Sequence, residues 1–123
     1  MPPSLAEQLA AVKDRGTCRI MTRGRRTGKP HTRIIWFAAE DTVVYLGTLN
    51  ARRDWVRNAQ KNPDVELDFG AFRLHGRLST IADAGESHAR GLIAQKYWAA
   101  WIASWFGKGP ERMFRVDQLS VAG

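Results

Sequence analysis

The spacing of apolar and polar positions begins with a helical pattern. Leu5, Leu9 and Val12 recur at helical intervals and so fall on one face of a helix. Ser4, followed three residues later by Glu7, forms a capping box at the start of this stretch. The sequence therefore predicts a short amphipathic helix near the amino terminus.

The next stretch alternates between apolar runs and turns. Strands are predicted at residues 17–22, 31–39 and 42–48, and the glycine-punctuated turn 24–30 joins the first two. The apolar run 43–46 within the third segment is typical of a central or barrel strand, which is buried on both faces. We expect these three strands to form a meander.

The middle of the chain predicts a helix and then a hairpin. Asp54 is a candidate helix cap, and Asn62 and Pro63 end that helix. Strict alternation of apolar and polar residues follows at 65–69 and 72–78. We expect these two segments to pair as a hairpin.

The last part of the chain predicts a long helix at 83–106 and a final strand at 113–121. The second half of the helix is apolar nearly all round, so another surface must cover it. Gly76 is expected to mark either a bulge or a sharp bend in the sheet, and a second irregularity, a bulge, is expected further along the chain. The second, near Gln118, reconciles two apolar registers in the final strand.

These elements predict a mainly β or α+β fold. Six strands interrupted by helices, without β-α-β alternation, favour a small barrel over a parallel sheet. The length of 123 residues favours one soluble globular domain, residues 1–123.

Charge points to an anionic partner. The chain has 19 Lys and Arg against 12 Asp and Glu, which gives a formal net charge of +7 at pH 7. No acidic residue stands between Gly16 and Arg33, where the basic residues gather. A noncatalytic nucleic-acid binder is one alternative. This alternative is not favoured, because the aromatic residues of the predicted long helix are clustered at helical spacing and are not interleaved with the arginines, as they are in proteins that bind single strands.

Several other classes of protein lack support. The three histidines and Cys18 do not fall at metal-ligand spacings, so no metal site is expected. Cys18 is expected to be a small core residue, and a single thiol suits a reducing cytoplasm, where we expect the protein to reside. No apolar run approaches the roughly 20 residues that a membrane-spanning helix needs.

Two motifs resemble a known family. Gly-Arg-Arg-Thr-Gly-Lys-Pro occupies residues 24–30, and Trp-x-x-Asn-x-x-x-Asn-Pro occupies residues 55–63. Together and in this order they resemble the deazaflavin-dependent nitroreductases and quinone reductases. The resemblance implies a six-stranded antiparallel split β-barrel, related to the flavin-binding pyridoxamine-phosphate oxidase fold, and coenzyme F420 as cofactor.

The resemblance also implies roles for individual residues. Arg25, Arg26 and a further basic residue among Lys29, His31 and Arg33 match positions that hold the phosphate and polyglutamate tail of the cofactor. Other implied cofactor contacts are Trp36, Gly47, Thr48, Arg52, Arg53 and Trp55. Asn58 is expected to bond the backbone at the junction of helix and barrel. The acceptor must also receive a proton, and Tyr97 is the candidate donor, with Tyr45 and solvent as alternatives.

The implied activity is transfer of a hydride from reduced coenzyme F420 to a quinone, a nitroaromatic compound or an activated enone. The segment 48–53 departs from the Ser-Lys-Gly-Gly type of loop that many members carry, so an FMN-dependent oxidoreductase is an alternative. A protein that binds the cofactor without turnover is another. A homodimer is expected from the fold analogy and the apolar helix.

Overall fold

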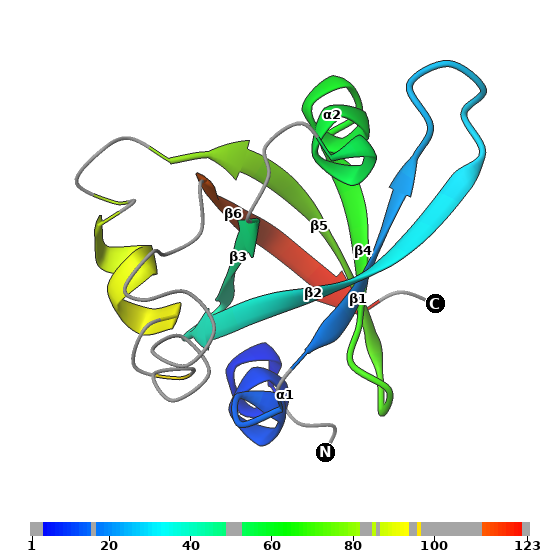
Figure 1. The fold of residues 1–123 in the computed structure, drawn as a ribbon. Helices are drawn as coiled ribbons and strands as arrows, with labels where there is room; N and C mark the ends of the chain where they lie inside the picture. Colours follow the sequence, from blue (N-terminus) through cyan, green and yellow to red (C-terminus); the bar gives the residue numbers. More distant parts are fainter. Residues whose placement is uncertain are drawn as a thin grey trace.

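The computed structural model describes residues 4–15, 17–48, 53–81, 85, 87–93, 96 and 112–121. In these ranges two helices and six strands have defined bounds (Figure 1). They are, in chain order, α1 (Leu5–Val12), β1 (Cys18–Arg23), β2 (Pro30–Glu40), β3 (Val43–Thr48), α2 (Asp54–Lys61), β4 (Asp64–Asp68), β5 (Arg73–Thr80) and β6 (Arg112–Val121).

The strands form a closed antiparallel barrel in the order β1-β2-β3-β6-β5-β4, which β4 closes by pairing with β1. The predicted meander is confirmed as β1-β2-β3, and the predicted hairpin as β4-β5. β6 is the last strand of the chain, and it lies between β3 and β5. The prediction of a mainly β, six-stranded antiparallel barrel is confirmed.

The barrel interior is filled by the inward-facing residues of the strands. The fully buried ones include Ile20, Phe37, Leu46, Leu67, Leu74 and Phe114. Burying a large apolar side chain contributes about 1.5–3 kcal/mol, so this cluster is the main source of stability. The predicted role of Cys18 is confirmed, because it is 3% exposed and belongs to the same core.

The two helices lie at opposite ends of the barrel (Figure 1). α1 begins with the predicted cap, in which the hydroxyl of Ser4 accepts a hydrogen bond from the backbone N–H of Glu7 at 3.2 Å. α2 lies beside the projecting end of the β1-β2 hairpin and contacts β1 and β2 (Figure 1). This second end holds the pocket described below.

The predicted bulge between the last two strands is confirmed. His75 pairs with Ser120 and Arg77 with Asp117, so two residues of β6 lie opposite the single residue Gly76. Gln118, one of the two, adopts a positive φ of 53°. A Cβ at Gly76 would lie 2.6 Å from a methyl carbon of Val116 and 3.0 Å from the backbone carbonyl oxygen of Asp117, so the close approach of the strands favours glycine there.

A second, smaller apolar cluster lies on the other face of β2. The helical residues Ala89 and Ile93 pack there against Ala38, Tyr45 and Met113. These contacts confirm the first part of the predicted late helix. The aromatic residues of its second half, Tyr97, Trp98, Trp101, Trp105 and Phe106, lie outside the described residues.

The described residues include neither a membrane-spanning helix nor a group of metal ligands. None of the helices there is long and apolar enough to cross a membrane. No group of three or more His, Cys, Asp or Glu residues in the same ranges is placed so that it could hold a metal ion.

Candidate functional site

The turn between β1 and β2 has a defined backbone. The N–H of Gly24 donates to the carbonyl of Lys29 at 2.8 Å, and the N–H of Gly28 donates to the carbonyl of Gly24 at 2.9 Å. Gly28 has a φ of 72°, in the left-handed region that glycine adopts without strain. The hydroxyl of Thr27 accepts from the N–H of Lys29 at 3.3 Å. These bonds fix how the turn presents its side chains.

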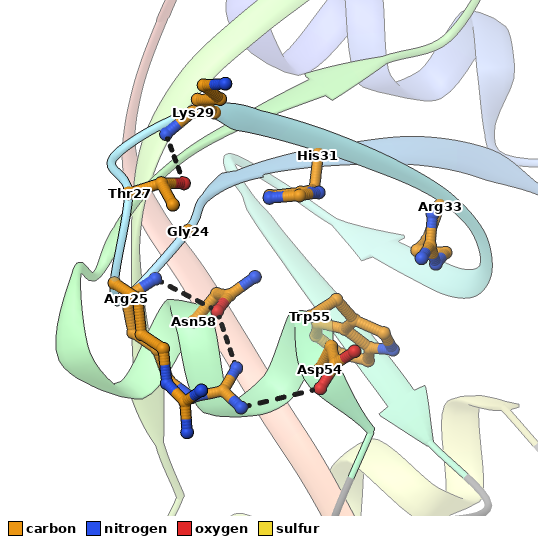
Figure 2. Close-up of a pocket in the computed structure, with 10 residues that line it drawn as sticks. Gly24, Arg25, Thr27, Lys29, His31, Arg33, Asp54, Trp55 and Asn58 are labelled. Atoms are coloured by element: carbon orange, nitrogen blue, oxygen red, sulfur yellow. Dashed lines mark hydrogen bonds and ion pairs between the residues drawn. The ribbon is translucent and has the colours of Figure 1, made fainter.

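A pocket of about 410 Å³ lies between this hairpin and α2 (Figure 2). This volume lies within the range of about 300–1,000 Å³ that is usual for small-molecule sites. Both motifs noted in the sequence contribute to it. The lining residues are Gly24, Arg25, Arg26, Thr27, Lys29, His31, Arg33, Asp54, Trp55 and Asn58.

Basic side chains dominate this lining. Lys29, His31 and Arg33 stand at alternate positions along one edge of the hairpin, and alternate residues of a strand share a face. Arg25 and Arg26 come from the turn. Asp54 is the single carboxylate among the ten lining residues. The pocket is therefore strongly positive.

Arg25 is the most firmly held of these cations. Its backbone N–H and its Nη1 both donate to Oδ1 of Asn58, at 3.2 Å and 2.9 Å (Figure 2). Its Nη2 lies 3.5 Å from Oδ1 of Asp54. Asn58 and Asp54 stand one turn apart on α2, so the helix fixes the position of this guanidinium.

The other cations of the pocket remain available to a ligand. In the part of the chain that the structure describes, Arg26, Lys29 and Arg33 have no acidic partner. Arg33 donates only to the carbonyl of its neighbour Thr32, at 3.0 Å. Exposed guanidinium and ammonium groups of this kind bind phosphate or carboxylate oxygens.

The pocket also has an aromatic residue in its lining, Trp55. Trp55 is 4% exposed and packs edge-to-face on Phe114, with ring centroids 5.8 Å apart and an interplanar angle of 72°. The barrel core thus reaches the base of the pocket. A ligand here meets charge on one side and an aromatic ring on the other.

The structure brings six of the predicted cofactor contacts together at this pocket. They are Arg25, Arg26, Lys29, His31, Arg33 and Trp55.

The other predicted cofactor contacts that the structure describes do not line this pocket. Trp36 pairs with Gly47 across β2 and β3, next to Thr48, and none of these three lines the pocket. Arg53 is exposed at the N-cap position of α2 and does not line it either. Arg52 and Tyr97 lie outside the described residues.

The prediction that Asp54 is the N-cap of the second helix is wrong. α2 begins at Asp54 itself, and Arg53, at the cap position, makes no side-chain capping bond. The carboxylate of Asp54 pairs with the Arg25 guanidinium instead. The sequence did not single out Gly24, Thr27 and Asp54 as lining residues. The spacing of Asp54 and Asn58, four apart on a helix, was the available signal that both side chains face one partner.

Comparisons with known proteins identify the family of this chain. The sequence profile of the family described as pyridoxamine 5'-phosphate oxidase matches residues 5–122. The chain belongs to this family, whose split barrel binds flavin-type cofactors. No curated protein matches the sequence.

Solved structures share the fold at low sequence identity. One is described as an F420-H2 dependent reductase, FDR-A; it is 18% identical, with 84% of this chain and 95% of that chain covered, and the TM-score is 0.67. A pyridoxamine 5'-phosphate oxidase homologue from Listeria innocua is 14% identical, with 96% and 98% covered and a TM-score of 0.63. A third, described as a domain-swapped dimer, is 19% identical, with 85% and 81% covered and a TM-score of 0.68.

These comparisons confirm the split-barrel relationship that the two sequence motifs implied. The fold family contains both F420-dependent reductases and pyridoxamine-phosphate oxidases. Both of these kinds of protein are oxidoreductases, and the fold binds flavin-type cofactors.

Proposed function

We propose that this protein is an oxidoreductase that binds coenzyme F420 and passes a hydride from its reduced form to an electron-poor acceptor. The acceptor class is a quinone, a nitroaromatic compound or an activated enone. The observation that carries the proposal is the convergence of five basic side chains on one pocket whose base is Trp55.

The residues of the pocket fit the anionic end of this cofactor. Coenzyme F420 carries a phosphodiester and several carboxylates on one tail. Arg26, Lys29 and Arg33 have no acidic partner in the described ranges and offer charge-assisted hydrogen bonds to such oxygens. Arg25, already fixed by α2, offers a preorganised guanidinium face. Preorganised donors lose little conformational entropy when the ligand binds.

The contribution of the protein to the reaction is binding and orientation. When bound, coenzyme F420 supplies the hydride, and the chain determines where the cofactor ring lies relative to the acceptor. Anchoring the tail at the hairpin restricts the position of the whole cofactor. Restricting two reactants in this way can lower a barrier by several kcal/mol. Tyr97 is our proposed source of the proton that the reduced acceptor takes up.

FMN is the second candidate cofactor, because the split barrel of the matched family binds flavin-type cofactors. FMN ends in a single phosphate. The pocket has more cations than one phosphate engages, since five basic residues line it against one carboxylate. This excess supports a ligand with several anionic groups.

A titration of the purified protein with oxidised coenzyme F420, and separately with FMN, tests the proposal. We expect quenching of the deazaflavin fluorescence with saturable binding, and weaker binding of FMN. The reduced cofactor with a quinone acceptor should then be oxidised only in the presence of the protein. Tight binding of FMN without binding of coenzyme F420 would assign the protein to the flavin-dependent branch.

We also propose that the working unit is a homodimer, in line with the neighbour described as a domain-swapped dimer. Light scattering on the purified protein measures the mass directly. A mass near 28 kDa, about twice the 13.8 kDa of one chain, is the expected result. A mass of one chain at micromolar concentration would contradict it.

A further inference from the structure

Asn58 occupies an unusual place for a polar side chain. It is 4% exposed, on a helix that packs against the barrel, and yet it lines the pocket. Both of its described side-chain bonds come from Arg25, one from the backbone and one from the guanidinium. Because both partners are donors, only the amide oxygen of Asn58 can face them. The orientation of the amide is therefore fixed by chemistry.

We propose that Asn58 is the positioning residue for the anion-binding guanidinium of Arg25. A neutral amide accepts the two hydrogen bonds and leaves the positive charge of Arg25 intact. A carboxylate at the same place would hold the guanidinium equally well but would cancel its charge. Different substitutions at position 58 should therefore change either the position of the Arg25 guanidinium or the net charge of the pair.

Asp54 provides the contrast on the same helix. Its carboxylate reaches Arg25 at 3.5 Å and is 73% exposed, so water screens the pair. A ligand oxygen can replace such an exposed partner, whereas the buried oxygen of Asn58 stays in place. In the assembled site, Asn58 holds the guanidinium and Asp54 is exchanged for the ligand.

The inference rests on the proposed function only in that the anion is taken to be the cofactor tail. Inorganic tripolyphosphate is therefore used as a second probe, because it presents several anionic oxygens without a redox ring. The positioning of Arg25 is also measured without any ligand.

The ligand-free measurement is arginine labelling with phenylglyoxal, followed by mass spectrometry. In N58L we expect Arg25 to react about tenfold faster than in the wild type, because its guanidinium has lost the acceptor. In N58D the acceptor remains, so Arg25 should stay protected. N62L is the matched control. It makes the same chemical change just beyond the end of α2, at a residue that does not line the pocket, and should leave the labelling of Arg25 unchanged.

The binding measurement is a double-mutant cycle with tripolyphosphate and with oxidised coenzyme F420. Affinity should fall about tenfold in N58L through loss of position, and by a similar factor in N58D through loss of charge. The loss in N58L should disappear in the R25Q background, because Asn58 then has no guanidinium to position. The loss in N58D should persist there, because a carboxylate at position 58 repels an anion whether or not Arg25 is present. A purely structural Asn58 would lower affinity equally in both backgrounds.

The outcomes separate the two proposals. Unchanged labelling of Arg25 in N58L, or a loss of affinity in N58L that persists in R25Q, overturns the role of Asn58. If N58L does not fold, N58D decides alone: protected labelling of Arg25 together with weakened binding supports the role, and any other result overturns it. Arg25-dependent binding of tripolyphosphate without binding of coenzyme F420 supports the role and contradicts the proposed function. Failure of the wild type to bind either probe contradicts both.

Discussion

The protein holds cations in two regions that differ in their surroundings. At the hairpin, Arg26, Lys29 and Arg33 stand exposed around an open pocket. Towards the α1 end of β2, Lys96 is half-buried; its Nζ lies 3.5 Å from the centroid of the Phe37 ring and donates to the Phe37 carbonyl at 3.0 Å. One region offers its charge to a ligand, and the other contacts its own protein.

Burial explains the difference in chemistry. Desolvation lowers the pKa of Lys96 from 10.5 to about 8, although the neighbouring Cys18 and Asp14 oppose the shift. Burial also raises the pKa of the Cys18 thiol from 9.0 to about 12, against the opposing influence of Lys96. The side chains of Arg26, Lys29 and Arg33 around the pocket are exposed to water instead. The distribution of basic residues along a sequence therefore does not by itself tell which of them can bind an anion.

The largest expected effect is a loss of cofactor affinity when two cations are removed from the hairpin pocket. We expect R25A/R26A to bind coenzyme F420 about 100-fold more weakly than the wild type, because each charge-assisted hydrogen bond contributes about 1.5–3 kcal/mol. Fluorescence titration measures this. The control R73A/R77A removes the same charge from exposed residues of β5, outside the pocket. Equal losses in both double variants would show that net charge alone governs binding.

The next effect concerns the thiol in the core. Folding raises the pKa of the Cys18 thiol from 9.0 to about 12. The contribution of this thiol to stability is therefore fully present below pH 9.0 and is lost as the pH rises from 9.0 towards about 12. We expect urea denaturation to show a steeper loss of stability above about pH 9 for the wild type than for C18A. Identical pH profiles for the two proteins would contradict this assignment.

The same burial should protect the thiol from reagents. In the native protein, Cys18 should react with iodoacetamide at least about 100-fold more slowly than in urea, since the protonated, buried thiol is not a nucleophile. Mass spectrometry measures the rate. Fast native alkylation would place the thiol outside the core.

Lys96 should show the opposite dependence on pH. Its folded pKa is lowered, so between about 8 and 10.5 the unfolded chain binds more protons and stability rises with pH. The window overlaps that of Cys18, so K96M is best compared with its parent in the C18A background. There, K96M should lack the rise while binding coenzyme F420 normally. A rise that persists in K96M would assign the effect to another group.

The smallest expected effect is a gain in anion affinity when Asp54, the exposed partner of Arg25, loses its charge. D54N removes the exposed carboxylate of the pocket while keeping a side chain of the same size. We expect affinity for tripolyphosphate to rise about two- to fivefold, the size typical of one exposed ion pair. Isothermal titration calorimetry resolves such a change. A loss of affinity would mean that Asp54 itself supports the bound anion.

Local patterns in the sequence predicted much of this fold. The capping box at Ser4 and the bulge at Gln118 both depend on residues close in the chain or on one strand register. The turn at residues 24–30 and its basic side chains were equally visible. The predicted cations Arg25 and Arg26 accordingly line one pocket in the structure.

Contacts between distant parts of the chain were not predictable in the same way. The pairing of β3 with β6 depends on barrel closure. Lys96 reaches Phe37 across 59 residues, and no local pattern marks a lysine that will cover a ring. Asp54 has the sequence features of a helix cap, and only the position of Arg25, 29 residues earlier in the chain, shows that its carboxylate serves another partner.

We propose that the hairpin pocket holds the anionic tail of a deazaflavin cofactor. The most direct test compares the affinity of the wild-type protein for coenzyme F420 with its affinity for the same deazaflavin ring lacking the phosphodiester and carboxylates. We expect the tailless compound to bind at least about 100-fold more weakly at low salt, and added salt to narrow the difference in affinity. Equal affinity for the two compounds at low salt would contradict the assignment.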